Sequence, residues 1–188
     1  MLKRGADIMS ASLLLPPLLP LFALICAAIC IDSKGSPIFI QERVGKDGKH
    51  FKCLKFRTMV KDAPHSLSKA EMKTPAAYVT RVGGFLRKSS LDELPQLINV
   101  LIGDMSIVGP RPVIPGETLL GDLRAKYGVY EVRPGITGLA QVCGRDEIAP
   151  EEKAMLDRFY VGYESFGADA VICFYTVKKV LTGKNIKY

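Results

Sequence analysis

Two adjacent carboxylates, Asp92 and Glu93, lie between a short basic segment and an apolar stretch. Arg87 and Lys88 precede the pair, and Arg111 follows it between two prolines, which restrict the backbone on either side of the guanidinium. A carboxylate can attack phosphorus as a nucleophile, and cationic side chains neutralise the charge of phosphate groups during such a reaction. These residue types, so close together, are suited to phosphoryl-transfer chemistry.

The same segment also fits a purely structural interpretation. Ser90 and Glu93 match the S-x-x-E capping box, and apolar residues follow at helical spacing, so a helix is predicted to begin at Ser90 and to end at Gly103. Asp92 would then lie in the first turn, where the helix dipole favours the ionised carboxylate and also attracts phosphate. The local sequence does not decide between a helix cap and a catalytic group.

The elements that must position these groups begin with an apolar segment. Residues 8–31 are almost uncharged and long enough to cross a bilayer, which takes about 20 residues. Prolines, each of which removes a backbone donor and disfavours a straight helix, interrupt the segment at Pro16, Pro17 and Pro20. Basic residues flank both ends, which predicts that both ends stay on the cytoplasmic side. We therefore expect a re-entrant helix, broken near these prolines, that dips into one leaflet. A single kinked span is the alternative.

A small domain is expected after this anchor. Residues 37–43 and 50–56 alternate in part between apolar and polar side chains and flank a glycine-containing turn, which predicts a β-hairpin. Lys55 and Arg57 fall on one face at its end, either as solvated cations or as cations that face a diphosphate. Three helices are predicted further along the chain, over residues 117–130, 151–163 and 168–181.

The fold class predicted from these elements is α+β. It combines a re-entrant (broken) membrane helix over residues 1–33 with a small cytoplasmic domain of helices and a β-hairpin over residues 34–188. The domain is expected to include interfacial amphipathic helices. Residues 168–181 are mostly apolar with lysines near the end, which fits a helix in the membrane interface with Lys178 and Lys179 toward lipid headgroups. A core helix with a basic exposed end is the alternative.

Composition narrows the choice of partner. The chain carries a formal net charge of +7, which indicates an anionic partner such as lipid, nucleic acid or a phosphorylated substrate. Nucleic acid is the least supported, because the sequence has no zinc finger, aromatic RNA-binding platform or helix-turn-helix pattern. The five cysteines are scattered and form no C-x-x-C pair, which argues against zinc or a disulfide framework and favours a reducing compartment.

A second polar cluster lies in a glycine-containing region. Arg133, Thr137, Gln141 and Arg145 surround glycines that would let the backbone approach a nucleotide closely. Plain turns are an equally good interpretation of these residues by themselves.

Longer segments around these residues resemble the bacterial sugar transferase family. Its members are the small monotopic phosphoglycosyl transferases that initiate surface-glycan or glycoprotein assembly. The matching segments are K-F-R-T-M at 55–59, S-L-D-E-L-P-Q at 90–96, N-V-L at 99–101, the run ending in P-R-P at 103–112, and the run at 132–142. Motifs this long, in this order, are specific.

The resemblance implies the transfer of a sugar-1-phosphate from a UDP-sugar to undecaprenyl (polyprenol) phosphate, with release of UMP. It implies a covalent aspartyl phospho-sugar intermediate on Asp92, with Glu93 as the second catalytic residue, and Mg²⁺ as the cofactor, held by these two carboxylates. Glu93 could instead assist the acceptor phosphate or only hold the helix cap. The enzyme would be monotopic, on the cytoplasmic face of the inner membrane, with membrane lipid as a further partner. The substrate-binding residues expected are Lys55, Arg57, Arg87, Arg111, Arg133, Thr137, Gln141 and Arg145.

Two rival functions are consistent with parts of the sequence. A non-enzymatic, basic, membrane-anchored adaptor explains the charge and the anchor, and a UDP-sugar hydrolase explains the carboxylates without a lipid acceptor. The candidate sugars are N-acetylated amino sugars, a diacetamido sugar, galactose and glucose, and the short chain favours the N-acetylated class. The sequence does not define the oligomeric state.

Overall fold

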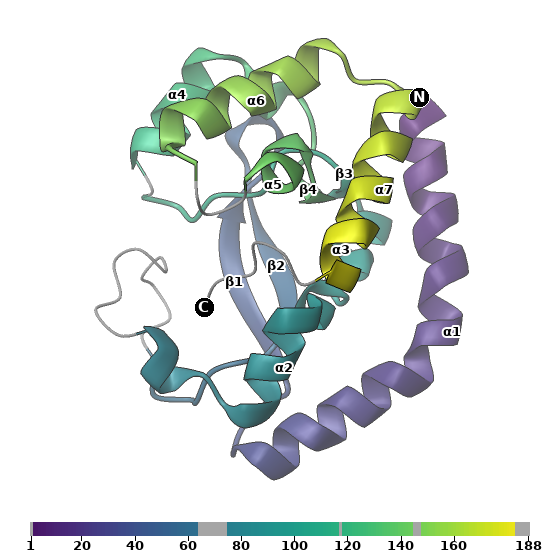
Figure 1. The fold of residues 1–188 in the computed structure, drawn as a ribbon, viewed down its shortest axis with the longest axis vertical. Helices are drawn as coiled ribbons and strands as arrows, with labels where there is room; N and C mark the ends of the chain where they lie inside the picture. The colour runs from purple at the N-terminus through teal and green to yellow at the C-terminus, as the bar shows by residue number, and fades with distance from the viewer. Residues whose placement is uncertain (1, 64–74, 117, 145–147, 183–188) are drawn as a thin grey trace.

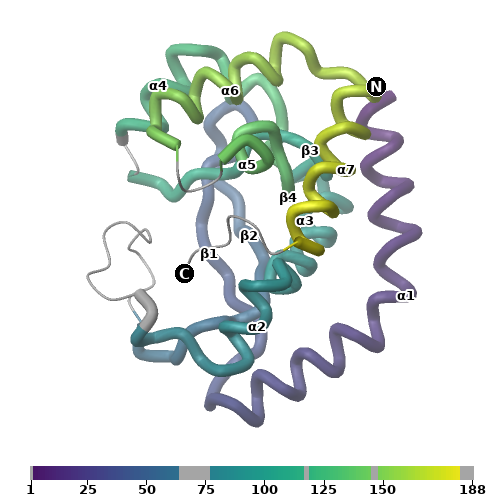
Figure 2. Tube along the Cα trace, viewed as in Figure 1, coloured from purple at the N-terminus to yellow at the C-terminus, as the bar shows by residue number. Residues whose placement is uncertain are grey.

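Helix α1 (Leu2–Asp32) is the longest element and runs along one side of the molecule (Figure 1). In this computed structural model, which describes residues 2–63, 75–116, 118–144 and 148–182, the helix continues through Pro16, Pro17 and Pro20. It bends midway, so that it bows around the rest of the chain (Figure 2). The predicted break is therefore a bend in a continuous helix, because the prolines remove single donors and leave the neighbouring hydrogen bonds in place.

Helix α1 is long and apolar enough to cross a membrane, with a mean hydropathy of 2.5 over its most apolar stretch. Many of its large side chains are not covered by the rest of the chain. Leu13, Leu19 and Leu24 are 69%, 59% and 68% exposed. This outer surface is suited to contact with lipid rather than with water.

The N-terminal end of α1 is held by polar contacts. Arg4 Nη1 donates a hydrogen bond of 2.6 Å to the carbonyl of Val100. The buried carboxylate of Asp7 accepts a hydrogen bond of 3.0 Å from the Ser106 hydroxyl. Buried polar groups that are paired in this way fix the position of the helix, because leaving any of them unpaired costs free energy.

The C-terminal end of α1 is held as firmly. Asp32 Oδ2 accepts a hydrogen bond of 3.0 Å from the backbone N–H of Val82. Arg57 donates to the carbonyls of Ser33 and Lys34 over 2.7 and 2.9 Å. Both ends of α1 are therefore bonded to the same body of helices and strands.

The predicted hairpin is confirmed. Strand β1 (Ile38–Val44) pairs antiparallel with β2 (His50–Phe56), from Ile38 opposite Phe56 to Val44 opposite His50. The connection contains the short 3₁₀ helix η1 (Lys46–Gly48).

The segment around the carboxylate pair folds differently from the prediction. The chain forms η2 (Pro75–Tyr78), α2 (Arg81–Ser89), the 3₁₀ turn η3 (Leu91–Glu93) and α3 (Gln96–Ile102). The predicted capping box is wrong, because Ser90 adopts a left-handed conformation with a φ of 56° and its side chain makes no cap hydrogen bond. Gly103, with a φ of 106°, ends α3 as predicted.

A second small sheet was not predicted. Strand β3 (Ser106–Val108) pairs parallel with β4 (Gly135–Thr137), although each strand is only 3 residues long. Gly135 is required there, since a Cβ atom at this position would lie 2.1 Å from the backbone nitrogen of Gly109. The residues interpreted as a tight loop therefore include a buried strand.

The remaining helices complete the fold. They are α4 (Thr118–Lys126), η4 (Val129–Glu131), α5 (Leu139–Cys143), α6 (Pro150–Gly162) and α7 (Phe166–Thr182). The predicted helices over residues 151–163 and 168–181 are confirmed as α6 and α7, and the one over 117–130 is confirmed in part by α4. Figure 1 shows α7 beside the first half of α1.

Helix α3 lies at the centre of the main core cluster. Its Leu97 and Val100 pack with Ala11 of α1, Cys53 of β2 and Met105, and all five are buried. The element that follows the carboxylate pair is thus fixed against the anchor helix and the hairpin at once.

Candidate active site

Asp92 and Glu93 lie in the short turn η3, between α2 and α3. The left-handed Ser90 closes α2, where its N–H bonds to the carbonyl of Arg87, and turns the chain toward α3. Glu93 is buried, whereas Asp92 is only partly covered. The two carboxylates therefore occupy different environments despite being neighbours.

Glu93 is the centre of an ion-pair cluster. Its Oε1 atom accepts hydrogen bonds from Lys55 Nζ at 3.1 Å and from Arg111 Nη2 at 2.7 Å. Two cations converge on this one buried carboxylate oxygen. Such a cluster holds the cations in place, and it also leaves net positive charge beside Asp92.

Asp92 carries no such pairing. Within the part of the chain that the structure describes, no side chain donates a hydrogen bond to its carboxylate. Burial, and then repulsion from Glu93, raise the pKa of Asp92 to about 6, against the opposing effect of the nearby Lys55, Arg111 and Arg87 charges. A carboxylate that is ionised at neutral pH but poorly solvated is suited to nucleophilic attack.

Lys55 is held in register with Glu93 by an asparagine from α3. The buried Asn99 donates to the carbonyl of Lys52 over 2.8 Å and accepts from the N–H of Leu54 over 2.9 Å. These bonds fix β2 against α3. The sequence motif contained Asn99, but its link to the hairpin depends on tertiary contact.

Arg111 is held through its backbone. The buried Arg124 of α4 donates to the Arg111 carbonyl over 2.6 Å and forms an ion pair with the buried Asp157 of α6, with 2.9 Å between Nε and Oδ2. Arg43 donates to the next carbonyl, that of Pro112, over 2.9 Å. The P-R-P segment is thus tied to α4, α6 and the hairpin. Sequence reasoning missed these three residues, since nothing in their spacing marks the pairing.

The other predicted site residues separate into two groups. Arg87 lies close enough to Asp92 for its charge to lower the pKa of that carboxyl. Its Nε atom donates a hydrogen bond of 2.8 Å to the Thr58 hydroxyl. Arg57 instead holds the end of α1, as described above. Arg133 bonds to the Gly103 carbonyl at 2.7 Å, at the opposite end of α3 from Asp92.

Arg145 lies outside the described residues, so the structure gives no position for it. Arg57 and Arg133 were expected to contact substrate, and the structure engages both with backbone carbonyls instead. Strand alternation placed Arg57 beside Lys55, but β2 ends at Phe56, and the Arg57 side chain extends to the carbonyls of Ser33 and Lys34. Their predicted substrate contacts stay predictions.

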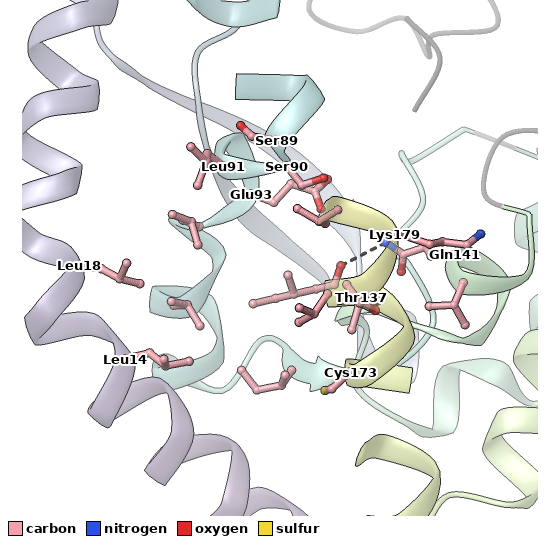
Figure 3. A pocket seen from close by; sticks show the side chains of 18 residues that line it. Leu14, Leu18, Ser89, Ser90, Leu91, Glu93, Thr137, Gln141, Cys173 and Lys179 are labelled. Carbon is pink, nitrogen blue, oxygen red and sulfur yellow. Dashed lines mark hydrogen bonds between the residues drawn. The ribbon is translucent and has the colours of Figure 1, made fainter. Parts of the chain in front are cut away.

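Thr137 and Gln141 line a cavity of about 440 Å³ that also reaches Glu93. Its walls come from α1, α3 and α7 together with β3, β4 and α5, and most of the lining side chains are apolar (Figure 3). Gln141 donates to the Ile136 carbonyl over 3.1 Å. Lys179 of α7 also lines this cavity, whereas sequence reasoning had placed it toward lipid headgroups or at the exposed end of a core helix.

The side chains near Asp92 offer few ligands to a divalent metal ion. In residues 2–63, 75–116, 118–144 and 148–182, no group of three or more His, Cys, Asp or Glu side chains is placed to hold a metal ion. Mg²⁺ is commonly bound through one or two carboxylates, with substrate phosphates and water as its other ligands. Asp92 and Glu93 could bind Mg²⁺ in this way, together with substrate phosphates. They could not form a complete metal site by themselves.

Comparison with known proteins gives a consistent result. A family model described as bacterial sugar transferase matches residues 1–183. Exopolysaccharide production protein ExoY of Sinorhizobium fredii is 42% identical, over 97% of this chain and 87% of that protein. The UDP-glucose:undecaprenyl-phosphate glucose-1-phosphate transferase of Escherichia coli is 42% identical, over 98% of this chain and 41% of its own length.

A third relative is the undecaprenyl-phosphate glucose phosphotransferase of Komagataeibacter xylinus, which is 38% identical over 97% of this chain and 36% of that protein. The matches to these two transferases thus cover nearly all of this chain but less than half of theirs. The carboxylate turn, its cationic neighbours and nearly every other part of the chain lie within the matched region. This chain is therefore an enzyme that belongs to the bacterial sugar transferase family.

Proposed function

We propose that this enzyme transfers a sugar-1-phosphate from a UDP-sugar to undecaprenyl phosphate and releases UMP, with Asp92 as the covalent nucleophile. The observation that carries the proposal is the contrast within the carboxylate pair. Glu93 is neutralised by Lys55 and Arg111, while Asp92 is unpaired, poorly solvated and adjacent to the same cations. The two relatives named for glucose transfer make glucose the first candidate for the sugar.

The first step is attack on the phosphorus that carries the sugar. A carboxylate oxygen of Asp92 forms a bond to this phosphorus. The bond to the bridging oxygen breaks, and its electron pair leaves with UMP. Lys55, Arg111 and Arg87 stabilise the charge that develops on the phosphate oxygens. The product is a mixed anhydride of the Asp92 carboxyl and the sugar phosphate.

The second step restores the enzyme. A phosphate oxygen of undecaprenyl phosphate attacks the same phosphorus, and the bond to Asp92 breaks to give back the free carboxylate. The lipid then carries a diphosphate linked to the sugar. Splitting the transfer in this way lets the donor and the acceptor use the site in turn, which gives ping-pong kinetics.

Mg²⁺ fits the site as an ion bound jointly by the protein and the substrate phosphates. Asp92 is the better protein ligand, because the Oε1 atom of Glu93 already binds the side chains of Lys55 and Arg111. Bound there, the ion would neutralise diphosphate charge. Glu93 would contribute mainly by holding Lys55 and Arg111. Removing Mg²⁺ by chelation should therefore stop turnover.

The anchor is proposed to be re-entrant, with both ends of α1 on the cytoplasmic face of the inner membrane. The support is that polar contacts bind both ends to one domain: Arg4 at the start, and Arg57 with Ser33 at the end. A single straight span would separate these ends by the thickness of a bilayer. The bend in the proline-containing middle of α1 fits a helix that enters and leaves the same leaflet.

The test is UMP release from a panel of UDP-sugars, with and without undecaprenyl phosphate. Asp92→Asn should lower UMP release by about 10³-fold or more, because an amide cannot replace the nucleophile. Asp122→Asn, a change at an exposed carboxylate of α4, is the matched control and should behave as wild type. Undiminished turnover in Asp92→Asn would refute the covalent mechanism.

The same assay separates the rival functions. A UDP-sugar hydrolase would release UMP through many turnovers with no lipid present. An adaptor would release none with any UDP-sugar. The proposed transferase should release about one UMP per enzyme without acceptor, and continue only when undecaprenyl phosphate is added.

A further inference from the structure

The cavity beside the active site is apolar along most of its length. Leu14 and Leu18 of α1 form one side. Leu94, in the link between η3 and α3, and Leu97 of α3 lie next to the carboxylate turn. The facing wall comes from α7. The volume of the cavity, about 440 Å³, lies in the range of small-molecule binding sites. An unfilled apolar space of this size favours an apolar ligand, because polar groups placed there would lose their hydrogen bonds to water.

One end of the cavity is polar. Gln141 and Lys179 line it, and Figure 3 shows both on the side away from Leu14 and Leu18, while Glu93 lines the cavity beside Ser90. The hydroxyls of Thr137 and Thr176 bond to each other over 2.6 Å, so they are satisfied within the protein. Among the described residues that line the cavity, Lys179 is the one with a cationic side chain, and it can bind an anionic ligand.

We propose that this cavity is the binding site for the acceptor lipid. The first isoprene units of the polyprenyl chain lie between α1, α3 and α7, and Lys179 binds the phosphate of the acceptor next to Glu93. The inference rests on the proposed function for the identity of the lipid. The volume is far too small for a whole undecaprenyl chain, so the remainder lies in the membrane against the exposed face of α1.

The arrangement matches the shape and charge of a polyprenyl phosphate. That molecule has one anionic end and a long apolar chain, and the cavity has one cation-bearing end and long apolar walls. Uracil, ribose and the sugar would leave many hydrogen bonds unmade against these walls. The UDP-sugar therefore approaches Asp92 from another side, and the two substrates meet at the carboxylate turn.

The chain-binding part is tested by filling the cavity. Val180 of α7 lines it, whereas Val171 of the same helix is exposed and does not. Acceptors that differ only in chain length, farnesyl phosphate and dimethylallyl phosphate, are compared as substrates. Val180→Trp should reduce the preference for the farnesyl acceptor by about tenfold, because buried methylene groups are lost from the complex. Val171→Trp should keep the wild-type preference.

The phosphate-binding part is tested at the adjacent lysines. Lys179→Gln should raise the KM for both acceptors by the same factor, because the phosphate is common to them. Lys178→Gln is the matched control, since Lys178 is exposed and does not line the cavity. A chain-dependent effect of Lys179→Gln, or an equal effect of Lys178→Gln, would overturn this assignment.

The outcome is kept separate from that of the proposed function by measuring the UMP burst without acceptor. A normal burst together with an unchanged chain preference in Val180→Trp would overturn the cavity assignment and leave the transferase mechanism standing. Loss of the burst in wild-type protein would overturn the proposed function itself. If Val180→Trp fails to fold, photolabelling of wild-type enzyme with a diazirine-bearing farnesyl phosphate decides: labels should map to α7 and α3, and labels confined to other segments would refute the site.

Discussion

At the residue scale, the two neighbouring carboxylates differ because of their partners. The sequence predicted that a helix N-terminus would favour the ionised form of Asp92. The opposite is found, since α3 begins only at Gln96 and burial raises the pKa of Asp92. The residue identities were predicted correctly, but the sign of the pKa shift depended on burial, which no local pattern contains.

The raised pKa can be measured directly. In Mg²⁺-free protein, a ¹³C NMR titration of the aspartate carboxyls, assigned with Asp92→Asn, should give Asp92 a midpoint near pH 6. Glu93→Gln should lower this pKa, because it removes a neighbouring negative charge, and Lys55→Met should raise it further. The UMP burst should fall as the pH drops through about 6, where the carboxylate gains a proton. A midpoint near the ordinary value of about 4 would contradict this assignment.

Lys55 and Arg57 should behave differently although both were predicted to bind the diphosphate. Lys55→Met should lower the rate of the UMP burst by about 10²-fold with little change in melting temperature, because Lys55 lies beside the reacting groups. Arg57→Ala should lower the free energy of unfolding by about 2 kcal/mol, since its buried guanidinium binds carbonyls at the end of α1. Calorimetry and the rate of the UMP burst per folded molecule distinguish the two variants. An unchanged melting temperature in Arg57→Ala would contradict the structural role.

At the element scale, the predicted and observed folds agree where the signal is local. The hairpin and helices α6 and α7 follow from alternation, turn residues and helical periodicity. The parallel pairing of β3 with β4 could not be predicted, because it joins two 3-residue strands separated by more than 25 positions of sequence. The buried pair of Arg124 and Asp157 was missed for the same reason, since it forms between two different helices.

The topology of α1 is testable at this scale. In a variant without native cysteines, Leu2→Cys should resist a membrane-impermeant maleimide in intact cells and react after lysis, because both ends of α1 bind one domain, which is proposed to lie on the cytoplasmic face. Asp122→Cys, in that domain, is the matched control. Replacing Pro16, Pro17 and Pro20 by leucine should straighten the helix and expose the Leu2→Cys thiol outside the cell. Labelling of Leu2→Cys in intact cells with the prolines present would show a spanning helix.

At the scale of the whole molecule, the fold brings together two environments that the substrates need. The bowed helix α1 exposes an apolar surface. The cations Lys55 and Arg111 pair with Glu93 in the carboxylate turn, just before the start of α3. The cavity joins these two regions. Under the proposed function, a water-soluble nucleotide sugar and a lipid phosphate would meet at Asp92 without either crossing the membrane.

The most direct test of the account is the mass of the enzyme after incubation with a reactive UDP-sugar and no acceptor. Covalent catalysis by Asp92 predicts a gain equal to one sugar phosphate, located by peptide mapping on Asp92, absent in Asp92→Asn and lost when undecaprenyl phosphate is added. Turnover with no such adduct, or an adduct on a different residue, would contradict it.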